Sequence, residues 1–173
     1  RLGSVYVTGG SLDSASGLDY APIKYGPAGE PLWVRRYNGP GNGPDEANAL
    51  ALDAARNVYV TCSSPGATTD MDYATVKYDT DGNLLWVARY DGPGHDDDWA
   101  DDLALDDAGN VYVTGTSVTS GSDFDIVTIK YSSAGVEQWV RRHSGDAGVE
   151  DEANAIAADN SGNVYVTGVE DRG

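Results

Sequence analysis

Apolar and polar residues alternate along the chain with a period of two, in short runs separated by polar segments. Residues 58–61, Val-Tyr-Val-Thr, are β-branched and aromatic, as strand residues usually are. Residues 72–78 alternate in the same way, residues 84–90 form a third run, and residues 100–105 form a short fourth run of small and apolar residues. No window carries the apolar stripe of a capped helix, so the pattern predicts an all-β chain.

The four runs recur at a constant spacing of 53 residues. The tetrad Val-Tyr-Val-Thr begins at Val5, Val58, Val111 and Val164. The copies 3–55, 56–108 and 109–161 align without a gap, and 17 of their 53 columns are identical. A partial fourth copy occupies residues 162–173. Because self-similarity at a fixed period is the signature of a repeat architecture, residues 1–173 are predicted to form one repeat domain.

Four short antiparallel strands in each repeat are typical of a β-propeller blade. Within a blade we expect the order 100–105 innermost, then 110–115, 125–131 and the outer strand 138–143. The turns at 79–83 and 106–110 carry Gly where a positive φ is expected, and the longer connections are 62–71 and 91–98. One Trp per copy is predicted to fill the wedge between neighbouring blades: Trp33, Trp86 and Trp139.

Two segments of the chain resemble a known repeat family. They read Asp-x-x-Gly-Asn-Val-Tyr-Val-Thr-Gly at 106–115 and 159–168, and Asp98-x-Ala100 precedes the inner strand. This pattern is similar to the bacterial SBBP β-propeller repeats of large secreted or cell-surface proteins. The resemblance implies the propeller fold and an extracellular or cell-surface location, and it brings no family-wide catalytic residue. The second copy departs from the pattern, since Arg56 replaces the turn Gly and Cys62 replaces the Gly that follows Thr61.

Three copies are too few to close a propeller, which has about 4 to 8 blades. The N-terminal copy lacks an inner strand, whereas the C-terminal end supplies one at 152–158 and a further strand at 163–168. The expected partners are therefore the remaining blades of a longer chain, or a second copy that completes the ring.

The charge of the chain narrows the choice of partners. It has 28 Asp and Glu against 11 Lys and Arg, a net charge of −17. Such a chain repels phosphate backbones and anionic bilayers, so we expect neither nucleic acid nor a membrane as a partner. With 40% hydrophobic residues the chain is too apolar to be a disordered acidic segment, and the single cysteine, Cys62, cannot form an internal disulfide.

Catalytic motifs are absent from the sequence, and most polar residues recur in every copy. There is no His-Glu-x-x-His, Gly-x-Ser-x-Gly, Walker loop or Cys-x-x-Cys. Repeated residues are interpreted as structural, because an active site occurs once and a blade residue occurs in each blade. The aspartates that open the turns before the Val-Tyr-Val-Thr strands are expected to cap backbone N–H groups: Asp53, Asp106 and Asp159.

Residues found in one copy only are the candidates for function. Residues 96–102 of the second copy contain five carboxylates, and His95 and Trp99 occur only there. Three interpretations remain open: a solvated acidic loop, a Ca²⁺ site that includes Asp96, Asp97 and Asp98, or a glycan or peptide site in which Trp99 is a stacking platform.

The segment that leads into each inner strand also carries an aspartate: Asp45, Asp98 and Asp151. In a ring these three would circle one mouth of the channel, where they would bind a cation or accept hydrogen bonds from local backbone N–H groups. Apart from possible Ca²⁺, no cofactor is expected.

These observations favour a non-catalytic scaffold or binding module of a bacterial secreted or cell-surface protein. The first alternative is a propeller enzyme of lyase or glycosidase type, with two carboxylates at the channel mouth and a site shared with other blades. The second is a calcium-dependent lectin or adhesion propeller. The sequence alone leaves enzymatic activity open, with a non-catalytic role favoured.

Overall fold

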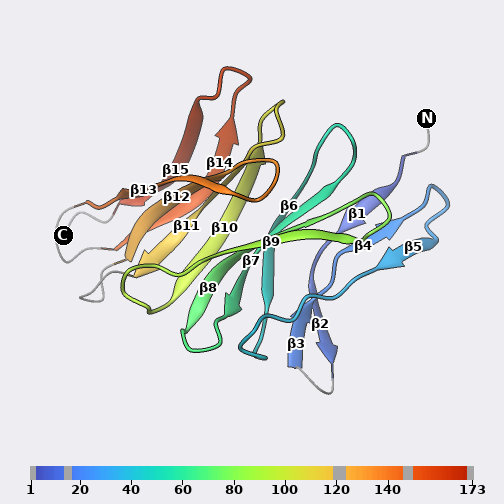
Figure 1. The fold of residues 1–173 in the computed structure, drawn as a ribbon, viewed down its shortest axis with the longest axis horizontal. Helices are drawn as coiled ribbons and strands as arrows, with labels where there is room; N and C mark the ends of the chain where they lie inside the picture. The colour runs from blue at the N-terminus through green and yellow to red at the C-terminus, as the bar shows by residue number, and fades with distance from the viewer. Residues whose placement is uncertain (1–2, 14–16, 119–123, 146–149, 171–173) are drawn as a thin grey trace.

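The chain folds as a row of antiparallel β-sheets, with the two termini at opposite ends of the row (Figure 1). A computed structural model describes residues 3–13, 17–118, 124–145 and 150–170, and every regular element in these ranges is a strand. No helix that could cross a membrane occurs in the described ranges. Residues 171–173 of the partial fourth copy lie outside them.

Two complete blades occupy the centre of the row. The second blade contains β6 (Glu46–Leu52), β7 (Val58–Pro65), β8 (Met71–Tyr78) and β9 (Leu84–Tyr90), hydrogen-bonded in that order. The third blade contains β10 (Asp98–Leu105), β11 (Val111–Val118), β12 (Phe124–Tyr131) and β13 (Glu137–His143) in the same order. The predicted strand order within a blade is confirmed.

Strand ends differ from the sequence prediction at several positions, and two of these differences affect the connections between strands and the inner strand. The connection predicted at 62–71 is shorter, because β7 continues to Pro65 and β8 starts at Met71. The inner strand β10 begins at Asp98, two residues earlier than predicted, and contains a bulge between Ala100 and Asp102. Asp101 is the extra residue of this bulge. Its side chain therefore does not follow the regular alternation of side chains between the two faces of the sheet.

Incomplete blades lie at both ends of the row. At the N-terminus, β1 (Val5–Val7), β4 (Ile23–Tyr25) and β5 (Pro31–Val34) form a three-stranded sheet, and β2 (Gly10–Asp13) pairs with β3 (Gly17–Tyr20) as a separate hairpin. At the C-terminus, β14 (Asp151–Ala158) pairs with β15 (Val164–Glu170). The sheets do not close on themselves, so the chain is a partial β-propeller.

The hydrophobic core lies between blades. One cluster joins the second and third blades through buried residues such as Tyr59, Tyr73 and Val113. The other joins the first and second blades around Tyr20, Trp33 and other buried side chains. Each blade therefore depends on its neighbour to bury its faces, as expected of a repeat architecture.

In the first and second blades, a Trp and a Lys donate hydrogen bonds to the β-turn of the next blade, and this pair of contacts is called here the Trp–Lys grip. Trp33 Nε1 and Lys24 Nζ both donate to the carbonyl oxygen of Thr80, at 3.1 and 2.8 Å. One copy later, Trp86 and Lys77 donate to the carbonyl oxygen of Ser133 at 3.2 and 3.1 Å. The Trp ring lies against a Gly of the same turn. A Cβ atom would come within 2.9 Å of Trp33 at Gly82 and within 2.7 Å of Trp86 at Gly135.

An arginine at the outer edge of each complete blade also reaches the preceding blade. Arg89 forms an ion pair with Asp72 at 2.9 Å and donates to the hydroxyl of Tyr37 in the first blade at 3.1 Å. Arg142 repeats this arrangement with Asp125 at 3.0 Å and with the Tyr90 hydroxyl at 3.4 Å. These contacts and the Trp–Lys grips fix the angle between neighbouring blades.

The predicted aspartate turns form in all three copies. Asp106 accepts hydrogen bonds from the backbone N–H and side-chain amide of Asn110 and from the hydroxyl of Tyr112. Asp53 and Asp159 make the same set of contacts in their copies. Arg56 takes the place of the turn Gly with a φ of 67°, close to the 77° of Gly109, so the departure of this copy does not change the turn.

Candidate functional site

The departures of the second copy from the repeat gather where the second blade passes into the third. Trp99 stands where the other copies have Glu46 and Glu152, and Asp101 stands where they have Asn48 and Asn154. Asp91 likewise replaces Asn38 and Ser144. Since these residues follow one another through the loop 91–97 and the inner strand β10, unique side chains are concentrated at one rim of the molecule.

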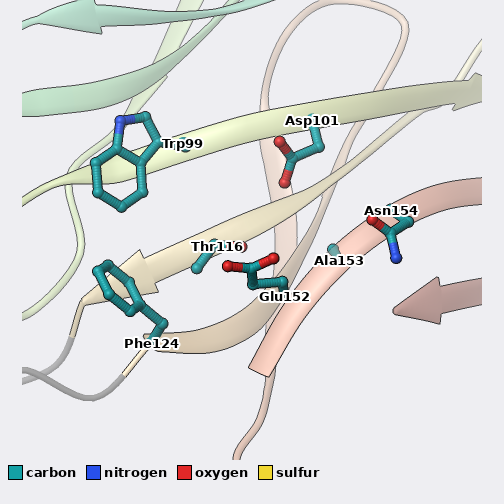
Figure 2. Close-up of a pocket in the computed structure, with 7 residues that line it drawn as sticks. All are labelled: Trp99, Asp101, Thr116, Phe124, Glu152, Ala153 and Asn154. Atoms are coloured by element: carbon teal, nitrogen blue, oxygen red, sulfur yellow. The ribbon is translucent and has the colours of Figure 1, made fainter. Parts of the chain in front are cut away.

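Trp99 lines a cavity of about 280 Å³ between the third blade and the β14–β15 hairpin. The cavity, called here the Trp99 cavity, is lined by seven residues from four strands: Trp99, Asp101, Thr116, Phe124, Glu152, Ala153 and Asn154. Figure 2 shows the rings of Trp99 and Phe124 on one side and the polar groups of Asp101 and Asn154 on the other, with the Glu152 carboxylate between them. The two rings are tilted by 40° with centroids 5.3 Å apart.

At position 101 the second copy has Asp where the other copies have Asn, and this exchange changes the lining of the cavity. On the preceding blade, Asn48 Nδ2 donates to the carbonyl oxygen of Ala100 at 2.6 Å. At the corresponding position of the third blade Asp101 faces β14, and an ionised carboxylate has no hydrogen to donate to a carbonyl. Burial and the nearby Glu152 and Asp102 raise the pKa of Asp101 to about 6. The cavity thus holds a half-buried carboxyl group that keeps its proton to an unusually high pH.

The aspartates predicted as metal ligands lie at separate places in the structure. Asp45, Asp98 and Asp151 are buried, and each accepts a hydrogen bond from the backbone N–H of the residue six positions earlier: Gly39, Gly92 and Gly145. Asp96 is exposed, and Asp97 accepts a hydrogen bond from the backbone N–H of Met71 at 3.2 Å. The structure does not bring these five predicted metal ligands together.

A different set of carboxylates converges. Among the described residues, the one group of three or more potential metal-ligating side chains consists of Asp72, Asp91 and Asp98. Only Asp98 of this set was a predicted ligand. The sequence marks Asp72 as structural because an aspartate recurs at this position in every copy. Asp91 belongs to a loop whose position beside β8 depends on how two blades pack.

His95 does not belong to the Trp99 cavity. Its Nδ1 lies 2.7 Å from a carboxylate oxygen of Asp91, and its side chain is 72% exposed. Hydrogen bonding to Asp91 raises the pKa of His95. The residue has a φ of 56°, as Asn42 has 50° at the corresponding position, so its role in the backbone is to form a left-handed turn residue.

Sequence reasoning missed several residues of the Trp99 cavity. Phe124 occupies a position that carries Leu18 and Met71 in the other copies, so it was indistinguishable from an ordinary apolar strand residue. Glu152 and Asn154 belong to a strand 53 residues away from Trp99. Their place beside it follows from blade packing, although aligning the copies already marks Asp101 as an Asn-to-Asp exchange.

Comparison with known proteins agrees with the β-propeller fold. A family model described as a beta-propeller repeat, SBBP, matches residues 86–125 and 138–169. These two segments are similar to the SBBP β-propeller repeat. The matched residues include the Asp-x-x-Gly-Asn turns at 106–110 and 159–163, and the 53-residue period extends the same pattern to the preceding copies.

Two further proteins are similar to parts of the chain. An uncharacterized WD repeat-containing protein of Acanthamoeba polyphaga mimivirus is 31% identical over 111 residues, which cover 54% of this chain and 8% of that protein. A crystal structure of a protein of unknown function from Bacteroides caccae superposes with a TM-score of 0.53 at 14% identity, covering 86% of this chain and 47% of that one. The chain thus spans less than half the length of either protein, and the second likeness shows the fold alone.

The raised pKa values of two buried or half-buried carboxyl groups predict a pH-dependent stability. Burial raises the pKa of Asp98 to about 6, as it does for Asp101. A carboxyl group with a higher pKa in the folded chain binds its proton more tightly there. Its stabilising contribution is therefore complete below the unfolded pKa of ~3.9 and is lost as the pH rises through about 6. We expect the thermal midpoint to fall by roughly a few degrees between about pH 5 and about pH 7.5.

Thermal melts monitored by circular dichroism at both pH values check this expectation. Asp101→Asn, which restores the residue of the other copies, should reduce the fall, whereas Asp96→Asn at an exposed position should leave it unchanged. Equal midpoints at the two pH values, or an undiminished fall in Asp101→Asn, would contradict the assignment to these buried carboxyls. Below about pH 4 the trend should reverse. Hydrogen bonds from neighbouring groups outweigh burial and lower the pKa values of Asp53 and Asp106, which then become protonated.

Proposed function

We propose that the chain is part of a non-catalytic propeller that serves as a scaffold and binding module, with the Trp99 cavity as its binding site. The observation that carries the proposal is the composition of the cavity. Two aromatic side chains, two carboxylic acids and an amide converge there, and Trp99 and Asp101 both depart from the repeat.

The chemistry of the cavity favours a carbohydrate as the ligand. The apolar face of a sugar ring packs on an aromatic side chain, and its hydroxyl groups donate hydrogen bonds to carboxylate and amide oxygens. Trp99 and Phe124 supply the first kind of contact, and Asp101, Glu152 and Asn154 supply the second. An anionic ligand is disfavoured because the chain has a net charge of −17.

Replacement of the cavity's aromatic platform should abolish this binding. A glycan array would select a ligand, and isothermal titration calorimetry would then compare Trp99→Glu, which restores the residue of the other copies, with the parent. We expect affinity to fall at least about tenfold, because a buried aromatic anchor carries much of the energy of a binding site. Trp139→Ala, outside the cavity, should bind as the parent does. If no glycan on the array binds the chain, or if Trp99→Glu binds with unchanged affinity, the Trp99 cavity is not a carbohydrate-binding site.

One observation supports a second candidate, a propeller glycosidase or lyase. Asp101 and Glu152 are two carboxylic acids in one cavity, and the pKa of Asp101 is raised to about 6, as a general acid requires. Incubation of the chain with neutral and acidic polysaccharides tests this candidate. Products that appear with the parent chain and are absent with Asp101→Asn would replace the non-catalytic reading.

The ends of the row support further blades, or a second copy, as partners. Lys130 and Trp139 occupy the positions of the two Trp–Lys grips, and in the described chain no turn of a following blade lies against them. Exposed apolar residues accompany both incomplete blades, with Val5 56% exposed at one end and Val169 55% exposed at the other. Light scattering on the purified chain distinguishes the two partners, since a monomer mass would rule out closure by a second copy.

The proposed setting is a bacterial secreted or cell-surface protein. Its support is the likeness of residues 106–115 and 159–168 to SBBP repeats. Detection of the parent protein on intact, unpermeabilised cells tests it, and detection only after lysis would refute it.

A further inference from the structure

Three carboxylates converge at the rim between the second and third blades, apart from the Trp99 cavity. Asp72 lies near the start of β8, Asp91 follows β9, and Asp98 begins β10. Each offers a carboxylate oxygen, and the three oxygens lie within 4.8 Å of one another. Like charges at this distance repel strongly unless a proton or a cation neutralises them.

Two of these side chains are buried, and one of them, Asp72, holds an oxygen without a hydrogen-bond donor. Asp98 is fully buried, and Asp72 is only 4% exposed. The Oδ2 atom of Asp98 accepts a hydrogen bond from the backbone N–H of Gly92. The Oδ2 atom of Asp72 accepts hydrogen bonds from the guanidinium of Arg89 and from the hydroxyl of Thr69. Asp98 also has a hydrogen bond from the side chain of Ser117, whereas the Oδ1 atom of Asp72 has no hydrogen-bond partner. A carboxylate oxygen taken from water without a replacement donor is destabilising, and a bound cation would replace the lost hydration.

The neighbouring positive charges do not neutralise the group. Arg89 pairs with Asp72, and the exposed His95 contacts Asp91. Asp98 has no ion pair among the described residues. The group therefore keeps a negative charge in a largely buried position.

The other copies show that the blade fold does not require the third carboxylate. The position of Asp91 carries Asn38 in the first copy and Ser144 in the third, although both keep the two buried aspartates. The first copy has Asp19 and Asp45, and the third has Asp125 and Asp151. Asp91 thus adds a negative charge beside two buried acids at the one place where the repeat does not need it.

We propose that Asp72, Asp91 and Asp98 bind a divalent cation, and that Ca²⁺ fits this site best. Three carboxylates offer up to six oxygens, and Ca²⁺ takes six to eight oxygen ligands in flexible geometry, with water completing the set. The ligand set contains neither thiolate nor imidazole nitrogen, the donors that Zn²⁺ prefers. A bound ion would tie the loop 91–97 to β8 and to the first residue of β10, next to Trp99. None of the three proposed ligands lines the Trp99 cavity, so cation binding does not require a ligand in that cavity.

Calorimetric titration of the EDTA-treated, dialysed chain with CaCl₂ tests the proposal, together with thermal melts at the same Ca²⁺ concentrations. We expect one saturable site and a rise in the melting temperature on Ca²⁺ binding, because an ion that binds only the folded chain stabilises it. Asp91→Asn, which restores the residue of the first copy, should weaken Ca²⁺ binding at least about tenfold. Its melting temperature without Ca²⁺ should equal or exceed that of the parent, which shows that the variant folds.

Two control variants and a second metal make the test specific. Asp96→Asn, in the same loop at an exposed position, should bind Ca²⁺ as the parent does. His95→Asn, which restores Asn42 of the first copy, should also retain binding, since the imidazole is not a ligand. The absence of any heat or melting shift at millimolar Ca²⁺, or equal binding in Asp91→Asn, overturns the site. Tighter binding of Mg²⁺ than of Ca²⁺ overturns the choice of ion.

Discussion

Trp33→Ala is expected to lower the free energy of unfolding by about 3–5 kcal/mol, the usual cost of deleting a large buried aromatic side chain. Trp33 is only 8% exposed and packs between Tyr6 of its own blade and Tyr78 of the next blade. Its ring also covers Gly82, and its indole N–H donates to the carbonyl oxygen of Thr80. The substitution therefore removes three contacts at once: the aromatic packing between the two blades, the hydrogen bond to the turn, and the packing against a buried hydrophobic cluster. In a chain of this size it corresponds to a loss of roughly 10 °C in melting temperature.

Urea denaturation followed by circular dichroism measures this loss, and Trp139→Ala is the matched control. Trp139 has the same place in its blade and contacts Tyr112, but no turn of a following blade lies against it in the described chain. We expect the control to lose no more than about 1–2 kcal/mol. If Trp33→Ala and Trp139→Ala lose the same amount, the contact between blades is not the source of the stability of Trp33.

The period of 53 residues made the strand order of the complete blades predictable. Each copy shows the same alternating pattern of apolar and polar residues, so a strand that is unclear in one copy can be located from the other copies. The first blade departs from the prediction. The run 72–78 moved back by one period predicts a strand at 19–25, but the structure divides it into β3 and β4 around Ala21 and Pro22. Pro22 has no N–H to donate to the ladder, and this local interruption is absent from the other copies, which carry Thr75 and Thr128 at the same position.

The candidate sites were predictable only where one residue stood out along the sequence. Trp99 and Asp98 were identified because the acidic segment 96–102 breaks the repeat. Phe124, Glu152 and Asp72 were not, because each looks ordinary within its own copy. They become site residues through packing between blades, which brings together segments that the period places in different repeats. Alignment of the copies shows what is unusual, and the structure shows what the unusual residue touches.

Arg89→Met is expected to destabilise the chain by about 3 kcal/mol, since it leaves one member of a buried ion pair without its charged partner. The side chain of Asp72 is 6% exposed, and that of Arg89 is 22% exposed. The guanidinium also donates to Ser64 and to the hydroxyl of Tyr37 in the first blade, so its removal loosens the joint between two blades. Methionine keeps much of the apolar stem, which restricts the change to the charge and the hydrogen bonds.

Arg36→Met and a double-variant cycle separate the ion pair from the general loss of an arginine. Arg36 has the same place in the first blade but is exposed and donates only to the carbonyl oxygen of Ser11 among the hydrogen bonds of the described residues, so its replacement should change stability by less than about 0.5 kcal/mol. Adding Asp72→Asn to Arg89→Met should restore part of the loss, because the orphaned charge is then gone. Losses that simply add in the double variant would show that Arg89 acts through Tyr37 and Ser64. The joint between blades would then be held by hydrogen bonds to neutral groups, with Asp72 contributing little to it.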